Sequence, residues 1–158
     1  MKETFPPVIG APKRGKLGNP LPSVTLTALS AIQTTRIWPE GYEFFLEGQQ
    51  PLGIYVLYTG RVQLSVTDAH GRQMLLGTAQ PGDILGLSAV VSGKYYEETA
   101  IAAISSQAGF IKCHQFRHFL DHHPEAAFWV VQLLSDRVTT TLDQLSCFRQ
   151  LLPGALRQ

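Results

Sequence analysis

The chain has 158 residues, of which 44% are hydrophobic and 16% charged, and its formal net charge is +1. This length suits one domain with an ordinary core, and the near-neutral charge does not favour nucleic acid or a membrane surface as partner. No apolar run reaches the roughly 18 residues that a transmembrane helix needs. Cys113 and Cys147 are the only cysteines, too few for a disulfide framework or an iron–sulfur cluster. We therefore expect a cytoplasmic protein without a membrane anchor.

The first residues differ in composition from the rest of the chain. Residues 1–22 hold four basic residues and one acidic residue, a net charge of +3 (4 − 1), and they are rich in proline and glycine. Such a segment has too little apolar surface to form a packed structure. We expect a disordered basic leader over residues 1–22.

Residues 23–123 alternate short apolar runs with turns centred on glycine. The predicted strands are Thr35–Trp38, Glu43–Leu46, Gly53–Tyr58, Arg61–Thr67, Gln73–Thr78, Thr99–Ile104 and Gly109–Lys112. Turns about 8–12 residues apart, between β-branched and aromatic runs, are typical of an all-β sandwich or barrel. Val62, Leu64 and Val66 alternate with polar residues, so one face of that strand is expected to meet the core.

The period of the apolar pattern changes after the last predicted strand. Aromatic and leucine residues at i, i+3 and i+4 predict a short helix over Gln115–Asp121. Pro124 suits the first turn of a helix, and nothing breaks a helix before Pro153. We therefore expect a long helix over residues 124–152 and a short tail over residues 153–158.

The long helix carries a heptad stripe with one polar member. Its positions, three and four residues apart, are Val131, Leu134, Val138, Thr141, Leu145, Phe148 and Leu152. A helix of roughly 28 residues is about 42 Å long and overhangs a barrel of this size. We expect this stripe to pair with a second copy across a two-fold axis, giving a homodimer. The alternative is a helix folded back wholly on its own domain.

The order of the elements resembles the sensor domain of the Crp/Fnr transcription regulators, which is a cyclic-nucleotide-binding β-roll followed by a dimerisation helix. The resemblance covers about residues 24–150. It depends on glycines at the family's spacing, in the segments Pro39-Glu40-Gly41, Leu46-Glu47-Gly48, Tyr58-Thr59-Gly60, His70-Gly71 and Pro81-Gly82-Asp83. It implies a mainly β double-stranded β-helix, jelly-roll-like and flanked by helices, with a long C-terminal dimerisation helix.

Ligand-binding relatives hold the nucleotide with a Gly-Glu … Arg-small-Ala cassette, in which the glutamate binds the ribose 2′-OH and the arginine binds the phosphate. The matching residues of this chain are Gly86, Leu87, Ser88, Glu98, Thr99 and Ala100. The resemblance thus puts Leu87 at the glutamate position and Glu98 at the arginine position. A shift of the register by one residue puts Glu97 or Thr99 there instead, and neither is a cation. The resemblance also puts Thr141 where relatives meet the base with a hydroxyl, although a bond to its own helix is the alternative.

These two replacements predict a diverged pocket. A carboxylate 4 Å from a phosphate costs about 1 kcal/mol in water and about 4 kcal/mol at an effective dielectric of 20. The lost arginine contact adds about 1.5–3 kcal/mol. We expect no standard binding of cyclic AMP or cyclic GMP, no cofactor, and an unidentified small-molecule effector at most. Lys94 and Arg72 are candidate substitute cations.

Enzymatic and metal-binding functions fit the sequence less well. His114, His118 and His122 share one helical face, which is a metal-capable spacing. Histidines near the end of a short helix are more often exposed to solvent, so we expect no metal site. No nucleophile elbow, P-loop or other catalytic motif occurs, so we expect no enzyme.

The expected function is therefore that of a ligand-sensing regulatory module. Too few residues follow Leu152 for a helix-turn-helix domain, so we expect no direct DNA binding by this chain. Two alternatives stay open. The chain could be the effector domain of a truncated Crp/Fnr-type regulator, or a dimerisation partner that modulates full-length relatives.

Overall fold

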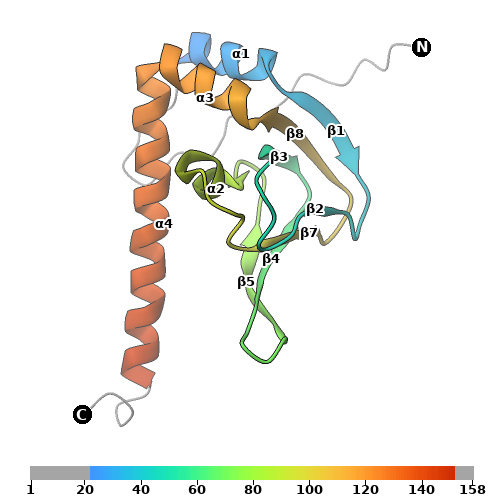
Figure 1. Cartoon of the computed structure of the whole chain (residues 1–158), viewed down its shortest axis with the longest axis vertical. Helices are drawn as coiled ribbons and strands as arrows, with labels where there is room; N and C mark the ends of the chain where they lie inside the picture. Colours follow the sequence, from blue (N-terminus) through green and yellow to red (C-terminus); the bar gives the residue numbers. More distant parts are fainter. Residues whose placement is uncertain (1–21, 152–158) are drawn as a thin grey trace.

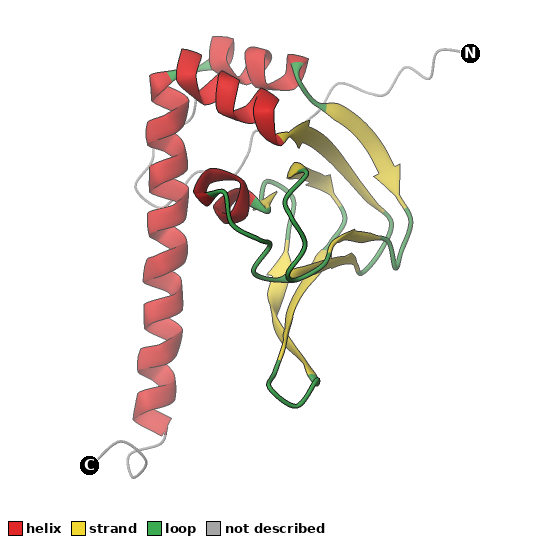
Figure 2. Ribbon diagram, viewed as in Figure 1, coloured by secondary structure: helices red, strands yellow, loops and turns green. Residues whose placement is uncertain are grey.

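The computed structural model describes residues 22–151, apart from the side chains of residues 144 and 148–151. The strands are β1 Thr34–Trp38, β2 Glu43–Phe45, β3 Gly53–Thr59, β4 Val62–Thr67, β5 Gln73–Ala79, β6 Ile84–Leu85, β7 Thr99–Ala102 and β8 Ser106–Lys112. The helices are α1 Ser23–Ala31, α2 Leu87–Ser92, α3 Cys113–His122 and α4 Pro124–Leu151. The helices lie to one side of the strands (Figures 1 and 2).

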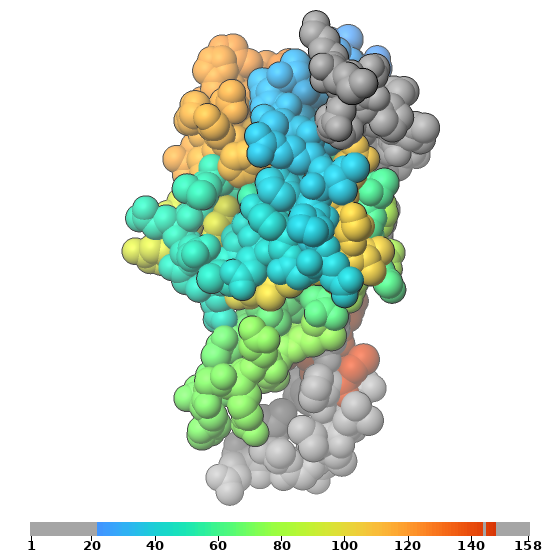
Figure 3. Space-filling view, turned by 90° about the vertical axis from the view of Figure 1, so that its right-hand side faces the viewer, coloured from blue at the N-terminus to red at the C-terminus, as the bar shows by residue number. Residues whose placement is uncertain are grey.

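The strands form two antiparallel sheets that face each other. One sheet has the order β1-β8-β3-β6 and the other the order β2-β7-β4-β5. Apart from the β4–β5 hairpin, strands that are neighbours in a sheet are not consecutive in sequence, as in a jelly roll. The β4–β5 pair extends beyond the other strands as a hairpin (Figures 1 and 3). The predicted mainly β fold with flanking helices and a long C-terminal helix is confirmed.

Buried side chains form two clusters. The cluster between the sheets is rich in aromatic residues and includes Phe44, Phe45 and Tyr55. The second cluster joins strands to helices and includes Ile54 of β3, Phe116 of α3 and Trp129 and Val130 of α4. The alternating strand pattern produces this division, because successive residues of β3 point to opposite faces.

The turn between β3 and β4 requires a glycine. Gly60 has a φ of +96°, in the region that side chains with a Cβ disfavour. A Cβ at this position would also overlap the buried side chain of Ser106. The Ser106 hydroxyl lies here because it accepts a hydrogen bond from the Arg61 N–H at 3.2 Å.

Helix α1 was not among the predicted elements. It packs on the helical cluster through Leu29, and the buried Thr25 hydroxyl donates to Glu125 Oε1 of α4 at 2.7 Å. This hydrogen bond is the main reason that the pKa of Glu125 lies below its ordinary value. Helix α1 is therefore fixed by tertiary contacts with the start of α4.

Helix α4 anchors at its N-terminal end and runs past the barrel toward the β4–β5 hairpin (Figure 1). Ala126, Trp129 and Val130 are buried against the barrel and the other helices. Leu152, the proposed tail and residues 1–21 of the proposed leader lie outside the described residues. Among residues 22–151, no helix has the length and apolar character needed to cross a bilayer.

Candidate functional site

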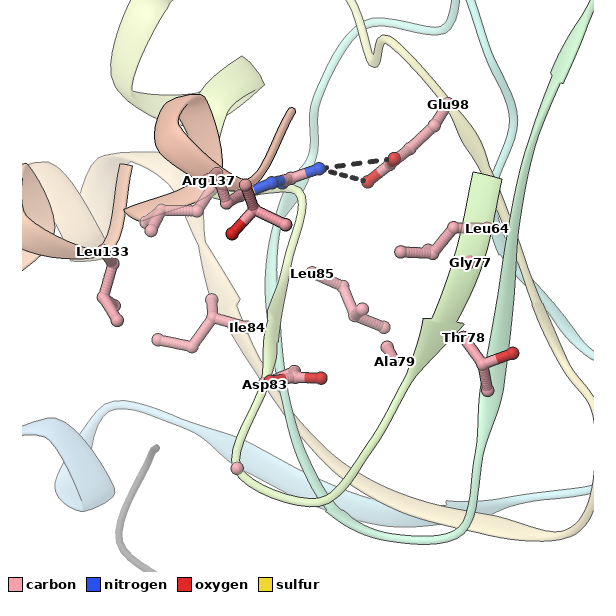
Figure 4. Close-up of a pocket in the computed structure, with 13 residues that line it drawn as sticks. Leu64, Gly77, Thr78, Ala79, Asp83, Ile84, Leu85, Glu98, Leu133 and Arg137 are labelled. Carbon is pink, nitrogen blue, oxygen red and sulfur yellow. Dashed lines mark hydrogen bonds and ion pairs between the residues drawn. The ribbon is translucent and has the colours of Figure 1, made fainter. Parts of the chain in front are cut away.

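A cavity of about 350 Å³ lies between the second sheet, β6 and helix α4 (Figure 4). Its walls are mostly aliphatic, with side chains from strands on one side and from α4 on the other. The lining residues are Leu64, Gly77, Thr78, Ala79, Gly82, Asp83, Ile84, Leu85, Leu87, Glu98, Leu133, Arg137 and Thr140. A concave apolar space with a few polar groups is the usual form of a small-molecule site.

An ion pair spans this cavity from the barrel to the helix. Glu98 directly precedes β7, and its side chain is only 10% exposed. Arg137 of α4 donates from Nη2 to Glu98 Oε1 at 3.3 Å and to Oε2 at 3.4 Å, as the dashed lines in Figure 4 show. The Arg137 side chain is 50% exposed. The carboxylate is therefore fixed inside, while the guanidinium reaches it from the solvent side.

The space in front of α2 is almost closed. Its volume is about 10 Å³, which is the least that one water molecule needs. The rings of Phe45 and Tyr96 stack there with centroids 4.0 Å apart. Gly86 precedes α2 with a φ of +79°, and a Cβ on it would lie 2.8 Å from the Tyr96 ring. The aromatic rings thus fill this side of the barrel.

Two adjacent carboxylates also border the small space. Glu97 and Glu98 both line it, and the Ser88 hydroxyl donates to Glu97 Oε1 at 3.1 Å. Arg137 lines the same small space and pairs with Glu98, so Glu97 is the carboxylate there that Arg137 does not contact.

The structure brings only some of the predicted binding residues to the cavity. Leu87 and Glu98 line it, whereas the Thr99 hydroxyl accepts a hydrogen bond from the Glu47 N–H at 2.9 Å. The Thr141 hydroxyl donates to the Arg137 carbonyl at 2.9 Å, as the alternative had it. Thr140, which was not predicted, lines the cavity instead. Contact of Thr99, Ala100 or Thr141 with a ligand stays a prediction.

Neither candidate substitute cation, Lys94 or Arg72, lines the cavity. Arg72 lies at the tip of the β4–β5 hairpin, where its Nε pairs with Asp68 Oδ2 at 2.9 Å. Lys94 lines a different groove, together with Cys113 and Arg117. Arg137 supplies the cation, 39 residues from Glu98 along the chain. Only the passage of α4 across the barrel brings the two together.

The profile of the cyclic nucleotide-binding domain family matches residues 35–123, which is more than half of the chain. The chain belongs to the cyclic nucleotide-binding domain family. The match includes Glu98 and all eight described strands except Thr34, the first residue of β1. It does not include α4, which carries Arg137. The family region thus ends where the long helix begins.

Similar proteins place this domain in different surroundings. Over 106 residues the chain is 29% identical to mouse patatin-like phospholipase domain-containing protein 7, covering 63% of this chain but 8% of that protein. The crystal structure of Thermus thermophilus Catabolite Activator Protein superposes with a TM-score of 0.74 at 19% identity, covering 81% of this chain and 60% of that one. The sensor domain of the transcriptional regulator DNR from Pseudomonas aeruginosa gives 0.64 at 21% identity, covering 78% and 83%.

The outer face of α4 exposes an apolar stripe. The large apolar residues exposed on this helix are Phe128, Val131, Val138, Leu142 and Leu145. With Ser135 they are three and four residues apart, which is heptad spacing. Leu134 of the predicted stripe instead packs partly against the helical core, and the side chain of Phe148 is not described. We call the five exposed residues the outer stripe.

The histidines of α3 do not converge on a shared centre. The rings of His118 and His122 stack with centroids 4.1 Å apart, and His122 Nδ1 lies 2.8 Å from the carbonyl oxygen of His118. In the described part of the chain, no three His, Cys, Asp or Glu side chains gather closely enough to hold a metal ion.

Replacing Arg137 with alanine is expected to lower the free energy of unfolding by about 1–3 kcal/mol, because the buried Glu98 carboxylate loses its partner. We expect a loss near the lower end of this range, because Arg137 is half exposed and water screens its charge. Urea unfolding followed by circular dichroism measures the change. Arg72→Ala is the matched control with a smaller loss, because the Arg72 side chain is 74% exposed. Equal losses in both variants would contradict a special role of the Glu98 pair.

Proposed function

We propose that this chain is a non-catalytic, ligand-sensing module of the cyclic nucleotide-binding domain family whose pocket no longer takes a cyclic nucleotide in the standard way. The observation that carries the proposal is the ion pair of Glu98 with Arg137 in the cavity wall. By the resemblance to Crp/Fnr sensors, Glu98 corresponds to the arginine that binds the phosphate, and its pairing with Arg137 supports a changed pocket. The family likeness alone would have suggested the opposite function.

Three features of the site support this proposal. The space in front of α2 holds about 10 Å³, much less than a phosphate group needs. Glu97 and Glu98 line it, with Arg137 paired to Glu98, and Leu87 is buried in place of a ribose acceptor. The larger cavity under α4 remains, with aliphatic walls. These features support an effector site whose lining suits a ligand other than a cyclic nucleotide.

The outer stripe of α4 supports a homodimer as the working unit of the module. Its members are exposed in the single chain, and heptad spacing suits a second helix of the same kind. A two-fold pairing would bury the stripe of both copies. The same α4 lines the cavity through Leu133, Arg137 and Thr140, so a ligand and a partner would meet opposite faces of one helix.

Both described cysteines are free thiols, which supports a reducing compartment such as the cytoplasm. No activity of the phospholipase domain-containing relative is carried over, because the shared 106 residues are 8% of that protein. The proposed role is to transmit occupancy of the cavity to a partner through α4.

Calorimetric titration with cyclic AMP and cyclic GMP tests the proposal. We expect dissociation constants weaker than about 10 μM for both nucleotides, or no heat of binding. Glu98→Gln is the informative variant, because removal of the carboxylate should strengthen any residual nucleotide binding. A dissociation constant below about 10 μM for the unmodified chain would overturn the proposal.

A further inference from the structure

The two members of the ion pair beside the cavity under α4 differ in their exposure to solvent. Glu98 is nearly enclosed, while half of the Arg137 side chain is in solvent. Both contacts come from the single atom Nη2, at 3.3 and 3.4 Å. Charge-assisted hydrogen bonds usually measure about 2.7–2.9 Å, and arginine often uses two nitrogens. Arg137 therefore holds Glu98 loosely.

The charges of the described lining residues disfavour an anion. Glu98 is acidic, and Arg137 is the only basic residue among the described lining residues. An anionic ligand would have to draw Arg137 away and would then lie beside the Glu98 carboxylate. A cationic ligand does the reverse, since it can replace Arg137 as the partner of a carboxylate that is largely buried.

The remainder of the wall specifies the body of the ligand. Aliphatic side chains come from both sheets and from α4, including Leu64, Ile84, Leu85 and Leu133. In Figure 4 they lie around the space beside and below the ion pair. A cavity of about 350 Å³ is near the lower end of the usual range for ligand pockets. The occupant is therefore small and mostly apolar.

We propose that this cavity binds a compact apolar amine, an alkylamine or arylalkylamine, whose ammonium group takes the place of Arg137 on Glu98. The proposal rests on the proposed function of the cavity as an effector site and names its ligand class. Displaced Arg137 returns to solvent, so that the ion pair between the barrel and α4 is exchanged for one between the barrel and the ligand.

A matched set of six-carbon probes tests the ligand class. Hexylamine, hexanol and hexanoate share their apolar body, and at pH 7 the amine is positively charged. Amide chemical shifts of the ¹⁵N-labelled full chain are followed during titration of each probe. For ligands of this size we expect dissociation constants in the millimolar range. Hexylamine should bind at least about tenfold more tightly than the other two, with shifts at Gly77, Leu85 and Thr140.

Variants of the two acidic neighbours locate the preference. Glu98→Gln should remove the advantage of hexylamine over hexanol, whereas Glu97→Gln should leave it unchanged. Arg137→Ala should bind hexylamine more tightly than the unmodified chain, because the competing cation is gone. This third variant keeps the test decisive if Glu98→Gln fails to fold.

Each contrary result has a distinct meaning. Tighter binding of hexanoate, equal binding of all three probes, or no shifts at the cavity up to saturating solubility would overturn the amine proposal. Such a result together with absent cyclic-nucleotide binding leaves the proposed function standing. Micromolar binding of cyclic AMP overturns the proposed function itself, whatever the amine does.

Discussion

Replacing Val138 with glutamate is expected to weaken the proposed homodimer by about 10²–10⁴-fold. Val138 lies in the outer stripe and is 58% exposed in the single chain, and a two-fold dimer buries it twice. Each copy then loses about 1.5–3 kcal/mol of burial, and each 1.4 kcal/mol is a factor of ten. Sedimentation velocity over a range of protein concentrations measures the dissociation constant.

Val24→Glu is the matched control for this experiment. Val24 is also an exposed valine, on α1 rather than α4, so the same change in charge should leave the dimer intact. A parent chain that is strictly monomeric, or a Val138→Glu variant that dimerises as well as the parent, would contradict pairing through the outer stripe.

Replacing Trp129 with alanine is expected to lower the free energy of unfolding by about 3–5 kcal/mol. Trp129 is 3% exposed and anchors α4 in the helical core, together with Leu29 and Phe116. Its removal leaves a large cavity that neighbouring rings cannot fill. Urea unfolding of the Val138→Glu background, followed by far-ultraviolet circular dichroism, gives the change without a contribution from dimerisation.

The adjacent residue provides a matched comparison on the same helix. Phe128 is exposed, so Phe128→Ala in the same background should change the unfolding free energy by much less than Trp129→Ala. In the chain that keeps Val138, the effect on dimerisation should have the opposite order: Phe128→Ala should weaken the dimer more than Trp129→Ala does. A loss below about 1 kcal/mol for Trp129→Ala would show that α4 is not anchored by this ring.

Much of the barrel could be predicted from local signals. Gly41, Gly48, Gly60, Gly71 and Gly82 all have positive φ, and this requirement is why glycines mark the turns between strands. Helix α1 gave no such signal. Its sequence contains β-branched residues and its first turn has no side-chain cap, so its stability depends on Leu29 and on the Thr25–Glu125 hydrogen bond.

The site was only half predictable. Comparison with the Crp/Fnr cassette singled out Leu87 and Glu98, and both line the cavity. The partner of Glu98 was missed, because Arg137 lies in a helix that the heptad pattern assigned to dimerisation. A period of 3.5 or 3.6 residues assigns faces of a helix only relative to one another. Which face meets the barrel is decided by packing at Trp129 and Val130.

The same ambiguity explains the register of the outer stripe. In the sequence, Leu134 and Thr141 fit the heptad spacing, and so do their neighbours Ser135 and Leu142. Leu134 packs partly against the helical core, whereas Leu142 lies in the part of α4 where every described side chain from Arg137 on is exposed. Apolar residues on two faces of one helix cannot be sorted without knowing what each face meets.

The two thiols of the chain lie in unequal surroundings. Cys113 is partly buried, its thiol donates to the Pro51 carbonyl at 3.0 Å, and burial raises its pKa, so it is slow to form the reactive thiolate. Cys147 is exposed on α4, about 200° around the helix from Leu145. A maleimide dye on Cys147 therefore labels the side of α4 that faces away from the outer stripe. In a dimer, two such dyes measure the distance between the two α4 helices without disturbing the contact between them.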